Sequence, residues 1–426
     1  MAERDERFPV DFDFERYLAE REGKVRARGP IEVGSPDPAD EGYVRDRLLS
    51  QAPGVLREPH GAFAHPYIVP GAVYESLWDW DAYFAGAGLA EVYPGHVRGC
   101  IESFLQRIRD DGRPAKLVLP SGEVQYGEGA LPLQAQWAVL ACRALGDYGW
   151  LRPYWPALVA CRRWYEGRLR GRRGLFHVAG HAGYGLDNNP AVYGRSPRSC
   201  APIDVNCFHY REYLAMAGIA RELGEGEAAD GYEREARRLC EAVNRYMWDP
   251  IDGMYYSIDV PSADARVSRQ GVTWEVPIKV RNASCLWPLW AGLATQQRAA
   301  AVRDHVMSAD EFLSAAGVRS HAACEPTYNN EPMGSPSNWQ GPVWGLTTFL
   351  TAYGLARYGF TADALEVAGR LVSVFASDLR ANSCIHECYH GDTGQPVIKP
   401  NFLSWNLLAV RVLADIRDGS DPFALD

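Results

Sequence analysis

The sequence predicts an all-α fold, an (α/α)6 barrel in which helical hairpins close into a ring and long loops gather at one end. Amphipathic runs with a helical period recur along the 426 residues. Many of these runs form pairs that are separated by short breaks containing Gly or Pro. Between the pairs lie long segments rich in Gly, Pro, Asn, Tyr and acids, and loops of this length in a compact domain are usually functional.

The helical runs follow one another along the chain in a regular order. The predicted helices cover 43–52, 80–91, 95–110, 133–147, 151–169, 205–224, 226–247, 283–294, 296–307, 341–358, 361–379 and 402–417. Tyr93-Pro94-Gly95 follows the second run, and Gly146 begins the break after the fourth. Gly224 and Gly359 lie in the breaks after the sixth and tenth runs. Because Gly and Pro stop one helix and start the next, each of these pairs is predicted to be a hairpin.

The long segments differ in character from the helices. They cover 111–132, 170–204, 248–282, 308–340 and 380–400. Met254 to Ile258 has the pattern of a short strand. An open α-solenoid is the alternative architecture, but no fixed sequence period is visible, which favours the closed ring. No Gly/Ser/Pro-rich linker divides the chain, so we expect one domain over residues 1–426, with residues 1–40 as an N-terminal extension.

Composition excludes several classes of protein. A net charge of −10 makes a surface for nucleic acid or another polyanion unlikely on electrostatic grounds. The first residues are charged and lack the apolar run of a signal peptide, and no stretch reaches the roughly 18 apolar residues of a membrane helix. The ten cysteines contain no CxxC pair, so we expect reduced thiols in a cytoplasmic protein. The sequence leaves the oligomeric state open, and a homo-oligomer is compatible with it.

Two acids in distant loops suggest the chemistry. Asp187 lies in the Gly-, Tyr- and Asn-rich segment 183–190, and Glu387 lies in the segment 384–390, which also contains two His. A pair of carboxyl groups that meet over one cleft is the minimum machinery for hydrolysing a glycosidic bond. Taken singly, each acid has a simpler interpretation: Asp187 as a solvated residue of an Asx-turn and Glu387 as an exposed loop acid.

A second segment, 69–84, alternates aromatic and acidic residues where a helix begins. Trp78 and Trp80 offer flat apolar faces for sugar C–H groups, and Asp81 offers acceptors for a pair of hydroxyls. The simpler interpretations are core packing for the two tryptophans and helix capping for Asp79 or Asp81.

At this point the sequence resembles known families. Segment 69–84 resembles the signature of trehalases, and Ser337 to Gly345 is similar to the Trp-Arg-Gly-Pro-Ile-Trp segment of glycoside hydrolase family 63. Residues 185–193 and 387–394 are similar to the stretches that carry the general acid and the general base of that family. Gln340 stands where the family pattern has Arg, and Ala72 and Val73 replace the Gly and Arg of the trehalase signature. The matches span residues 65–405, and the chain's size fits the bacterial mannosylglycerate and glucosylglycerate hydrolases.

The resemblance implies an inverting α-glycoside hydrolase that releases a hexose, mannose or glucose, and glycerate from a 2-O-α-hexosyl-glycerate. It implies that Asp187 is the general acid, with a raised pKa, and that Glu387 is the general base. The expected substrate-binding residues are Tyr74, Trp78, Trp80, Asp81, Gln134, Gln136, Asn188, Arg211, Trp339, Gln340 and Trp344. Arg211 and Arg281 are candidates for the glycerate carboxylate, because arginine binds carboxylates in bidentate fashion.

Several alternatives stay open. They are a trehalase or another small α-glucosidase, a helical-toroid sugar isomerase, and a non-catalytic sugar-binding toroid. His386 to His390 also matches the His-Glu-x-x-His pattern of zinc sites, but that chemistry requires a helix and the context indicates a loop. We therefore expect no metal, no cofactor and no membrane or nucleic-acid partner, only a small glycoside. The segment Glu325 to Pro332 is a candidate lid, with 334–336 as its hinge.

Overall fold

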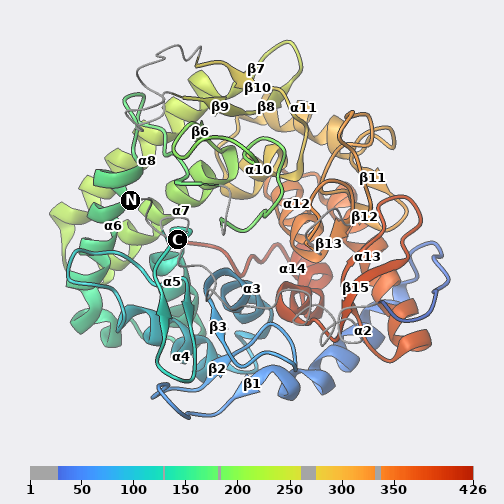
Figure 1. The fold of residues 1–426 in the computed structure, drawn as a ribbon, viewed down its shortest axis with the longest axis horizontal. Helices are drawn as coiled ribbons and strands as arrows, with labels where there is room; N and C mark the ends of the chain where they lie inside the picture. The colour runs from blue at the N-terminus through green and yellow to red at the C-terminus, as the bar shows by residue number, and fades with distance from the viewer. Residues whose placement is uncertain (1–26, 128–129, 181–183, 261–274, 332–336, 426) are drawn as a thin grey trace, which may run out of the picture.

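The computed structural model describes residues 27–127, 130–180, 184–260, 275–331 and 337–425. Its helices form two concentric rings, seen end-on in Figure 1. The inner ring consists of α3 (Asp79–Leu89), α5 (Gln134–Leu145), α7 (Ile203–Glu222), η3 (Ala283–Leu286) with α10 (Trp287–Ala291), α12 (Gly345–Arg357), and η4 (Ser404–Val410) with α14 (Val412–Asp418). The outer ring consists of α2 (Pro38–Gln51), α4 (Pro94–Leu105), η2 (Gly149–Tyr154) with α6 (Trp155–Leu169), α8 (Gly226–Tyr246), α11 (Gln296–Val306) and α13 (Thr361–Asn382).

The two rings differ in how their helices are buried. Every residue of α3 is buried, as expected for a helix that is surrounded by other helices. In α8, by contrast, the buried residues include Ala229, Ala236, Leu239 and Val243. This spacing places the apolar side chains on one face, so the charged face of α8 is left for the solvent.

The ring closes between the two ends of the chain. The first inner helix, α3, packs against η4, and the outer helix α2 packs against α13. Figure 1 shows this closure where blue α2 lies beside orange-red α13. A Cβ on Gly88 of α3 would lie 2.4 Å from the Leu407 carbonyl oxygen, so this contact requires glycine. The architecture confirms the predicted all-α (α/α)6 barrel.

Short and long connections alternate around the ring. Residues 90–93, 223–225 and 358–360 join the C-terminal ends of inner helices to the next outer helix. The return connections are long and cover 52–78, 106–133, 170–202, 247–282, 307–344 and 383–403. Every inner helix therefore begins where a long segment ends. Its N-terminus, which carries a partial positive charge, faces the end of the barrel where the loops gather.

Small antiparallel sheets stiffen the long segments. β3 (Leu77–Trp78), β4 (Leu117–Val118) and β5 (Val124–Gln125) form the first three-stranded sheet. The second joins β6 (Cys200–Ala201), β9 (Ser257–Asp259) and β10 (Pro277–Ile278), and the third joins β13 (Val343–Trp344), β14 (His386–Tyr389) and β15 (Pro396–Pro400). The hairpins are β1 (Leu56–Arg57) with β2 (Tyr67–Ile68), β7 (Trp248–Asp249) with β8 (Met254–Tyr255), and β11 (Leu313–Ser314) with β12 (Gly317–Val318).

Each predicted helical run contains a helix in the structure, and the predicted strand at Met254 to Ile258 corresponds to β8 and β9. Three runs are split. The run 151–169 begins in the 3-10 turn η2, which contains Pro153, 283–294 begins as the 3-10 turn η3, and 402–417 divides into η4 and α14. The single domain with an extension over 1–40 stays a prediction. Within that range, Ile31 donates its backbone N–H to Gln395 over 2.9 Å, and α2 begins at Pro38.

Two further features bear on the class of protein. In the part of the chain that the structure describes, no helix is long and apolar enough to cross a membrane. All ten cysteines are free thiols, and only Cys324 among them is exposed.

Candidate active site

A cavity of ≈ 160 Å³ opens at the end of the barrel where the long loops gather. Its walls come from five of the six long segments and from the first turns of α3 and η4. It is lined by Pro70, Tyr74, Trp78, Asp79, Trp80, Asp81, Lys116, Leu131, Tyr184, Gly185, Asp187, Ser337, Trp339, Glu387, Lys399, Phe402 and Trp405. The structure therefore brings both predicted acids, Asp187 and Glu387, to the same cavity.

Glu387 reaches the cavity from β14, and its side chain is only 5% exposed. Lys399, on the paired strand β15, places its Nζ 2.8 Å from a Glu387 carboxylate oxygen. Burial raises the pKa of Glu387; the Lys399 ammonium works in the opposite direction, and the charge of Asp187 adds to the increase. Asp187 therefore lies close enough to Glu387 for the two carboxyl groups to interact.

A buried network holds β14 from behind. His386 Nδ1 donates to Asp378 over 2.7 Å, and its Nε2 accepts from the Arg28 backbone N–H over 3.1 Å. The register slips between Cys388 and Tyr389, and this bulge lets the Tyr389 hydroxyl donate to Asp378 over 2.6 Å. His386 and Tyr389 thus point away from the cavity while the intervening Glu387 points into it. The His-Glu-x-x-His run is a strand and a turn, so it lacks the helix that the zinc pattern needs.

Asp187 lies in a turn of the 170–202 segment and is partly buried. Its neighbour Asn188 braces this turn against the 337–340 segment. The Asn188 side chain donates to Asn338 over 2.9 Å and accepts from the Trp339 backbone N–H over 2.6 Å. Gln340 Nε2 donates to the Asn188 carbonyl oxygen over 2.9 Å. Gln340, which replaces the family's Arg, therefore fixes the loop of Asp187 and does not line the cavity.

Seven of the 17 residues that line the cavity are aromatic. Trp80 lies 5.9 Å from Trp339 and 5.6 Å from Trp405 between ring centroids. Trp344 stacks behind Trp339 at 4.0 Å with an interplanar angle of 7°, so it supports the wall without lining the cavity. The indole N–H groups of Trp78 and Trp405 are buried and have no hydrogen-bond partner among the residues that the structure describes. Buried donors without an acceptor are uncommon, and each one calls for an explanation.

Asp79 and Asp81 enter the cavity from the first turn of α3. Ser404 Oγ donates to Asp81 over 2.9 Å. Burial raises the pKa of Asp81 to about 7; the Ser404 bond works against this rise, and the charge of Glu387 adds to it. Burial raises the pKa of Asp79 to about 6, while Lys116 works in the opposite direction. Near neutral pH Asp81 therefore exists in both protonation states and can donate or accept a hydrogen bond.

The segment that follows β14 has an unusual backbone. Lys399, Asn401 and Ser404 have φ angles of 48°, 64° and 24°, although none of them is glycine. Each of these conformations costs energy, and such residues cluster at functional sites. Here they turn Lys399 toward Glu387 and Ser404 toward Asp81. Burial works against the charge of Lys399, but Glu387 and Tyr74 raise its pKa above the ordinary value, so its ammonium stays protonated.

Besides Asn188, Gln340 and Trp344, three more of the predicted binding residues lie outside the cavity lining and bond to one another or to the core. Gln136 Nε2 donates to the Pro132 carbonyl over 2.7 Å, and its Oε1 accepts from Arg211 Nε over 3.2 Å. The Arg211 guanidinium lies 4.3 Å from the Trp290 ring and is buried. Gln134 is buried and its Oε1 faces Cys161. These polar groups satisfy each other within the barrel, so the structure does not bring them to the cavity.

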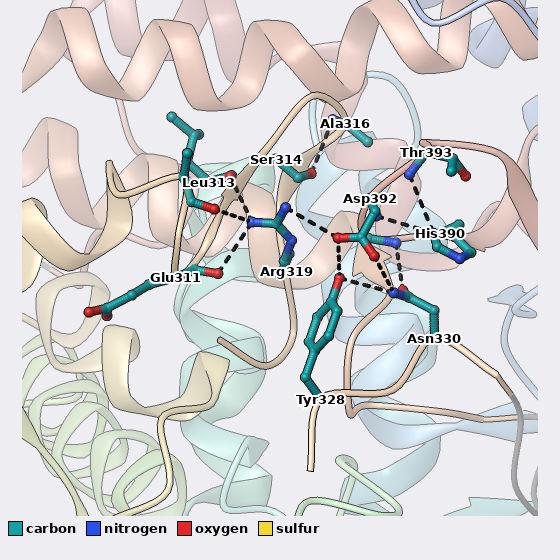
Figure 2. Close-up of polar contacts among 12 residues, drawn as sticks. Glu311, Leu313, Ser314, Ala316, Arg319, Tyr328, Asn330, His390, Asp392 and Thr393 are labelled. Atoms are coloured by element: carbon teal, nitrogen blue, oxygen red, sulfur yellow. Dashed lines mark hydrogen bonds and ion pairs between the residues drawn. The ribbon is translucent and has the colours of Figure 1, made fainter. Parts of the chain in front are cut away.

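The second carboxylate candidate, Arg281, also lies outside the cavity lining. Its Nη1 lies 3.6 Å from Glu311, and its backbone N–H donates to Glu325 over 2.9 Å. That bond holds the start of the predicted lid. Figure 2 shows a second anchor, in which Asp392 accepts from Tyr328 over 2.7 Å and from Asn330 over 3.1 Å. Arg319 Nη2 completes the group, 3.3 Å from Asp392.

These anchors tie the described part of the lid segment, residues 325–331, to the turn that follows β14. The hinge predicted at 334–336 lies outside the described residues, and the lid stays a prediction. The hydrogen bonds of Tyr328 and Asn330 with Asp392 therefore fix residues 325–331 relative to the turn after β14, the strand that carries Glu387.

Gly185 lines the cavity and packs tightly against the indole ring of Trp80. Its φ is 108°, and a Cβ on it would lie 2.7 Å from Trp80 Cζ3. An alanine at this position would strain the backbone and collide with the rigid indole ring. Because Gly185 is two residues before Asp187, the collision would move the Asp187 carboxyl group.

We expect Gly185→Ala to lower kcat about 10- to 100-fold, since the resemblance implies that Asp187 is the general acid and a shift near 1 Å at a reacting group has that cost. Steady-state kinetics and thermal unfolding would measure the loss. Gly180→Ala is the matched control, because Gly180 lies in the same segment, has no positive φ, and a Cβ there would meet no atom of the described residues within 4 Å. Equal kinetics for both variants would contradict the proposed contact.

Behind the wall, Asp204 is a buried acid outside the cavity lining. It lies in the first turn of α7 and is 1% exposed, and one of its carboxylate oxygens has no hydrogen-bond partner among the described residues. Burial raises its pKa from 3.8 to about 7. A carboxyl group with a raised folded-state pKa stabilises the fold below its unfolded-state pKa, and this contribution is lost as the pH rises through the folded-state pKa.

We expect Asp204→Asn to unfold at the same urea concentration as the wild type at pH 4. At pH 8 the variant should be more stable by roughly 1 to 4 kcal/mol, since each pKa unit corresponds to about 1.4 kcal/mol. Urea titrations at both pH values would measure this. A stability difference that does not depend on pH would show that Asp204 does not titrate as proposed.

The sequence does not single out Lys116, Lys399, Phe402, Trp405 or Tyr184, and it offers Asp79 either as a helix cap or as an acceptor for sugar hydroxyls. The hairpin register that pairs Cys388 with Ile398 brings Lys399 beside Glu387. The local sequence does not predict this strand pairing. A lysine 12 residues after Glu387 in a polar segment has the same sequence pattern as a solvated loop residue. The aromatic run around Phe402 and Trp405 was visible, but it was assigned to an ordinary helix.

Comparison with known proteins places the chain in a family. Residues 74–405 match the family described as the mannosylglycerate hydrolase MGH1-like glycoside hydrolase domain. The periplasmic trehalase of Pseudomonas aeruginosa is 24% identical over 365 residues, which are 72% of this chain and 62% of that protein. This chain therefore spans about three fifths of the length of that curated relative.

Solved structures share the fold. The family 63 mannosylglycerate hydrolase of Thermus thermophilus in complex with glucose has a TM-score of 0.67 and 21% identity, and the match covers 87% of this chain and 99% of that one. The neutral trehalase of Saccharomyces cerevisiae has a TM-score of 0.62 and 16% identity, covering 91% of this chain and 83% of that one. A glycoside hydrolase is also the enzyme class that the motifs predict, and the family match confirms it. The chain belongs to the mannosylglycerate hydrolase MGH1-like family of glycoside hydrolases.

Proposed function

We propose that this enzyme hydrolyses a 2-O-α-hexosyl-glycerate with inversion of the anomeric carbon. The observation that carries the proposal is the meeting of Asp187 and Glu387, from separate long loops, in one cavity walled by tryptophans. Inverting hydrolysis needs two carboxyl groups on opposite sides of the scissile bond. A cavity of ≈ 160 Å³ suits a small glycoside rather than a long polysaccharide.

In this mechanism Asp187 protonates the leaving oxygen and Glu387 takes a proton from the attacking water. Glu387 must be ionised to act, and the Lys399 ammonium at 2.8 Å stabilises its anionic form. Asp187 must hold a proton near neutral pH. The raised pKa expected for Asp187 stays a prediction, and it is supported by the interaction between its charge and that of Glu387.

The hexose would occupy the tryptophan-lined part of the cavity. Trp80, Trp339 and Trp405 offer apolar faces to the sugar C–H groups. Asp81, with a pKa of about 7, offers a pair of oxygens to hydroxyls, and the buried indole N–H groups of Trp78 and Trp405 offer donors. The residues that distinguish mannose from glucose are left open, since these sugars differ only in the orientation of one hydroxyl.

Lys116 is the residue that we assign to the carboxylate of the leaving group. Two cations line the cavity, Lys116 and Lys399. Lys399 is engaged by Glu387, whereas Lys116 forms no ion pair with any residue in the described ranges. Its charge acts on Asp79, whose pKa it lowers against the effect of burial. An anionic group of the substrate would find its partner here, in place of the sequence candidates Arg211 and Arg281.

We expect Lys116→Met to raise KM for a hexosyl-glycerate about 10- to 100-fold, since a charge-assisted hydrogen bond contributes about 1.5 to 3 kcal/mol. Lys116→Arg should keep most of the affinity because it keeps the charge. Steady-state kinetics on hexosyl-glycerate and on an uncharged aryl α-hexoside would measure the effect. An equal loss on both substrates would contradict a carboxylate-binding role.

A substrate panel tests the function itself. Glucosylglycerate, mannosylglycerate and trehalose are incubated with the enzyme, and proton NMR follows the anomer that is released first. We expect hydrolysis of a hexosyl-glycerate with the β-anomer of the hexose appearing first. Initial release of the α-anomer would contradict inversion, and hydrolysis of trehalose alone would contradict the substrate.

Trehalose is the second candidate substrate. The similarity to the periplasmic trehalase of Pseudomonas aeruginosa favours it. Trehalose carries no charge, however, and would leave the Lys116 ammonium without a partner. For the compartment, we propose the cytoplasm, since none of the ten cysteines forms a disulfide.

A further inference from the structure

A groove of ≈ 510 Å³ lies on the outer surface of the barrel, along the outer helices α6 and α8. It shares no lining residue with the active-site cavity. It is lined by Arg162, Arg163, Glu166, Arg170, Ala228, Gly231, Tyr232, Arg234, Glu235 and Arg238. Five arginines against two glutamates give the groove an excess of three positive charges, on a chain whose net charge is −10.

The two glutamates are already engaged. Glu235 lies 2.6 Å from Arg170 and also pairs with Arg238. Glu166 accepts a hydrogen bond from Tyr213 over 2.7 Å. The exposed Arg163 and Arg234, one on each helix, form no ion pair within the described ranges. The positive charge of the groove is therefore not neutralised by its own carboxylates.

Arg162 is the most informative residue of the groove, because its side chain is only 2% exposed. Its Nη1 lies 2.9 Å from His209 Nδ1, and its guanidinium lies 4.5 Å from the Tyr213 ring. The Nε atom lies 3.6 Å from Glu166, and neither Nε nor Nη2 has a hydrogen-bond partner among the described residues. Buried N–H groups without an acceptor are costly, and each one calls for an explanation.

We propose that this groove binds the phosphate group of a small phosphorylated molecule. Arg162, whose Nε and Nη2 have no partner among the described residues, belongs to the groove lining, and Arg163 and Arg234 add charge from the two helices. Guanidinium groups match phosphate oxygens in bidentate geometry and stay charged at all physiological pH values. A phosphate ester near neutral pH carries about two negative charges, which suits an excess of three positive charges better than a single carboxylate does.

Thermal unfolding tests the proposal on the intact enzyme. Inorganic phosphate, pyrophosphate and a hexose phosphate are titrated at constant ionic strength against chloride. We expect a saturable rise in Tm of about 3 °C at a hundredfold excess over Kd. A stronger effect of the hexose phosphate would identify a phosphorylated metabolite, and an equal effect of inorganic phosphate would identify the free ion.

The variant Arg163→Ala/Arg234→Ala should bind the same probe about 10- to 100-fold more weakly. Both side chains are exposed, so their loss should leave Tm in chloride unchanged. The matched control is Arg168→Ala/Arg245→Ala, which removes one exposed arginine from each of the same helices outside the groove lining. Equal binding by the two variants, or no saturable rise in the wild type, would overturn the proposal.

Discussion

Asp187→Asn is expected to lower kcat on a hexosyl-glycerate about 10²- to 10⁴-fold, the range typical for loss of a general acid. Asparagine keeps the size and the hydrogen-bonding shape of the side chain, but it has no proton to give to the leaving oxygen. Binding should therefore survive, and calorimetry should find the Kd for the substrate close to that of the wild type.

The same variant can be examined with a substrate that needs no protonation. An aryl α-hexoside with an acidic phenol leaves without help from a general acid, so its hydrolysis should lose far less in Asp187→Asn. Asp304→Asn is the control, because Asp304 is an exposed carboxylate on the outer helix α11. If both variants turned over the natural substrate at similar rates, Asp187 would not be the acid.

Glu387→Ala should be the second variant with a large loss, again about 10²- to 10⁴-fold in kcat. In the proposed mechanism Glu387 takes the proton from water on the face opposite the leaving group, and alanine cannot. The variant also leaves the buried Lys399 ammonium without its partner at 2.8 Å. Azide needs no deprotonation, and the space left by the side chain should admit it, so added azide should restore turnover.

The product of that rescue carries the stereochemical information. Azide that attacks from the position of the missing base gives a β-hexosyl azide from an α-linked substrate, and NMR coupling constants identify it. An α-hexosyl azide would instead place Glu387 on the leaving-group side. Glu91→Ala, which removes an exposed carboxylate on the short link after α3, should show neither the loss nor the rescue.

The sequence predicted the helices well because two different signals marked them. The run 226–247 became α8, Gly226–Tyr246, since an outer helix has one apolar and one charged face. Inner helices such as α3 are buried all round and lack that contrast, and the Gly and Pro breaks located them instead. The division of 402–417 into η4 and α14 was not predictable from the periodicity of the run, and neither was the close approach of Leu407, in η4, to Gly88 of α3.

The candidate site was predictable only where several chemical groups share one segment. Trp78, Trp80 and Asp81 stand together at the start of a helix, and the segments of Asp187 and Glu387 are similar to family motifs. Gln136 and Arg211 gave the same polar signal, yet they bond to each other inside the barrel over 3.2 Å. Sequence alone does not reveal whether a polar residue of an inner helix faces the cavity or a neighbouring helix.

Lys116 is the opposite case, because the structure places it at the cavity although the sequence does not single it out. It belongs to the site but stands alone in its segment, and only the pairing of β3 with β4 brings it beside Asp79. The Asp79 backbone N–H donates to the Lys116 carbonyl over 3.1 Å, a contact between positions far apart in the chain. Contacts of this kind depend on strand register, and register is set by the whole fold.

The closure of the ring has a consequence for how the enzyme is made. The Asp81–Ser404 hydrogen bond joins positions 323 residues apart, and α3 packs against η4 as well as against its neighbour α4. A ribosome must therefore release the chain beyond Ser404 before the sugar pocket can form. Until then the carboxyl groups of α3 stay exposed to solvent. The growing polypeptide depends on local hairpins or on chaperones to avoid aggregation.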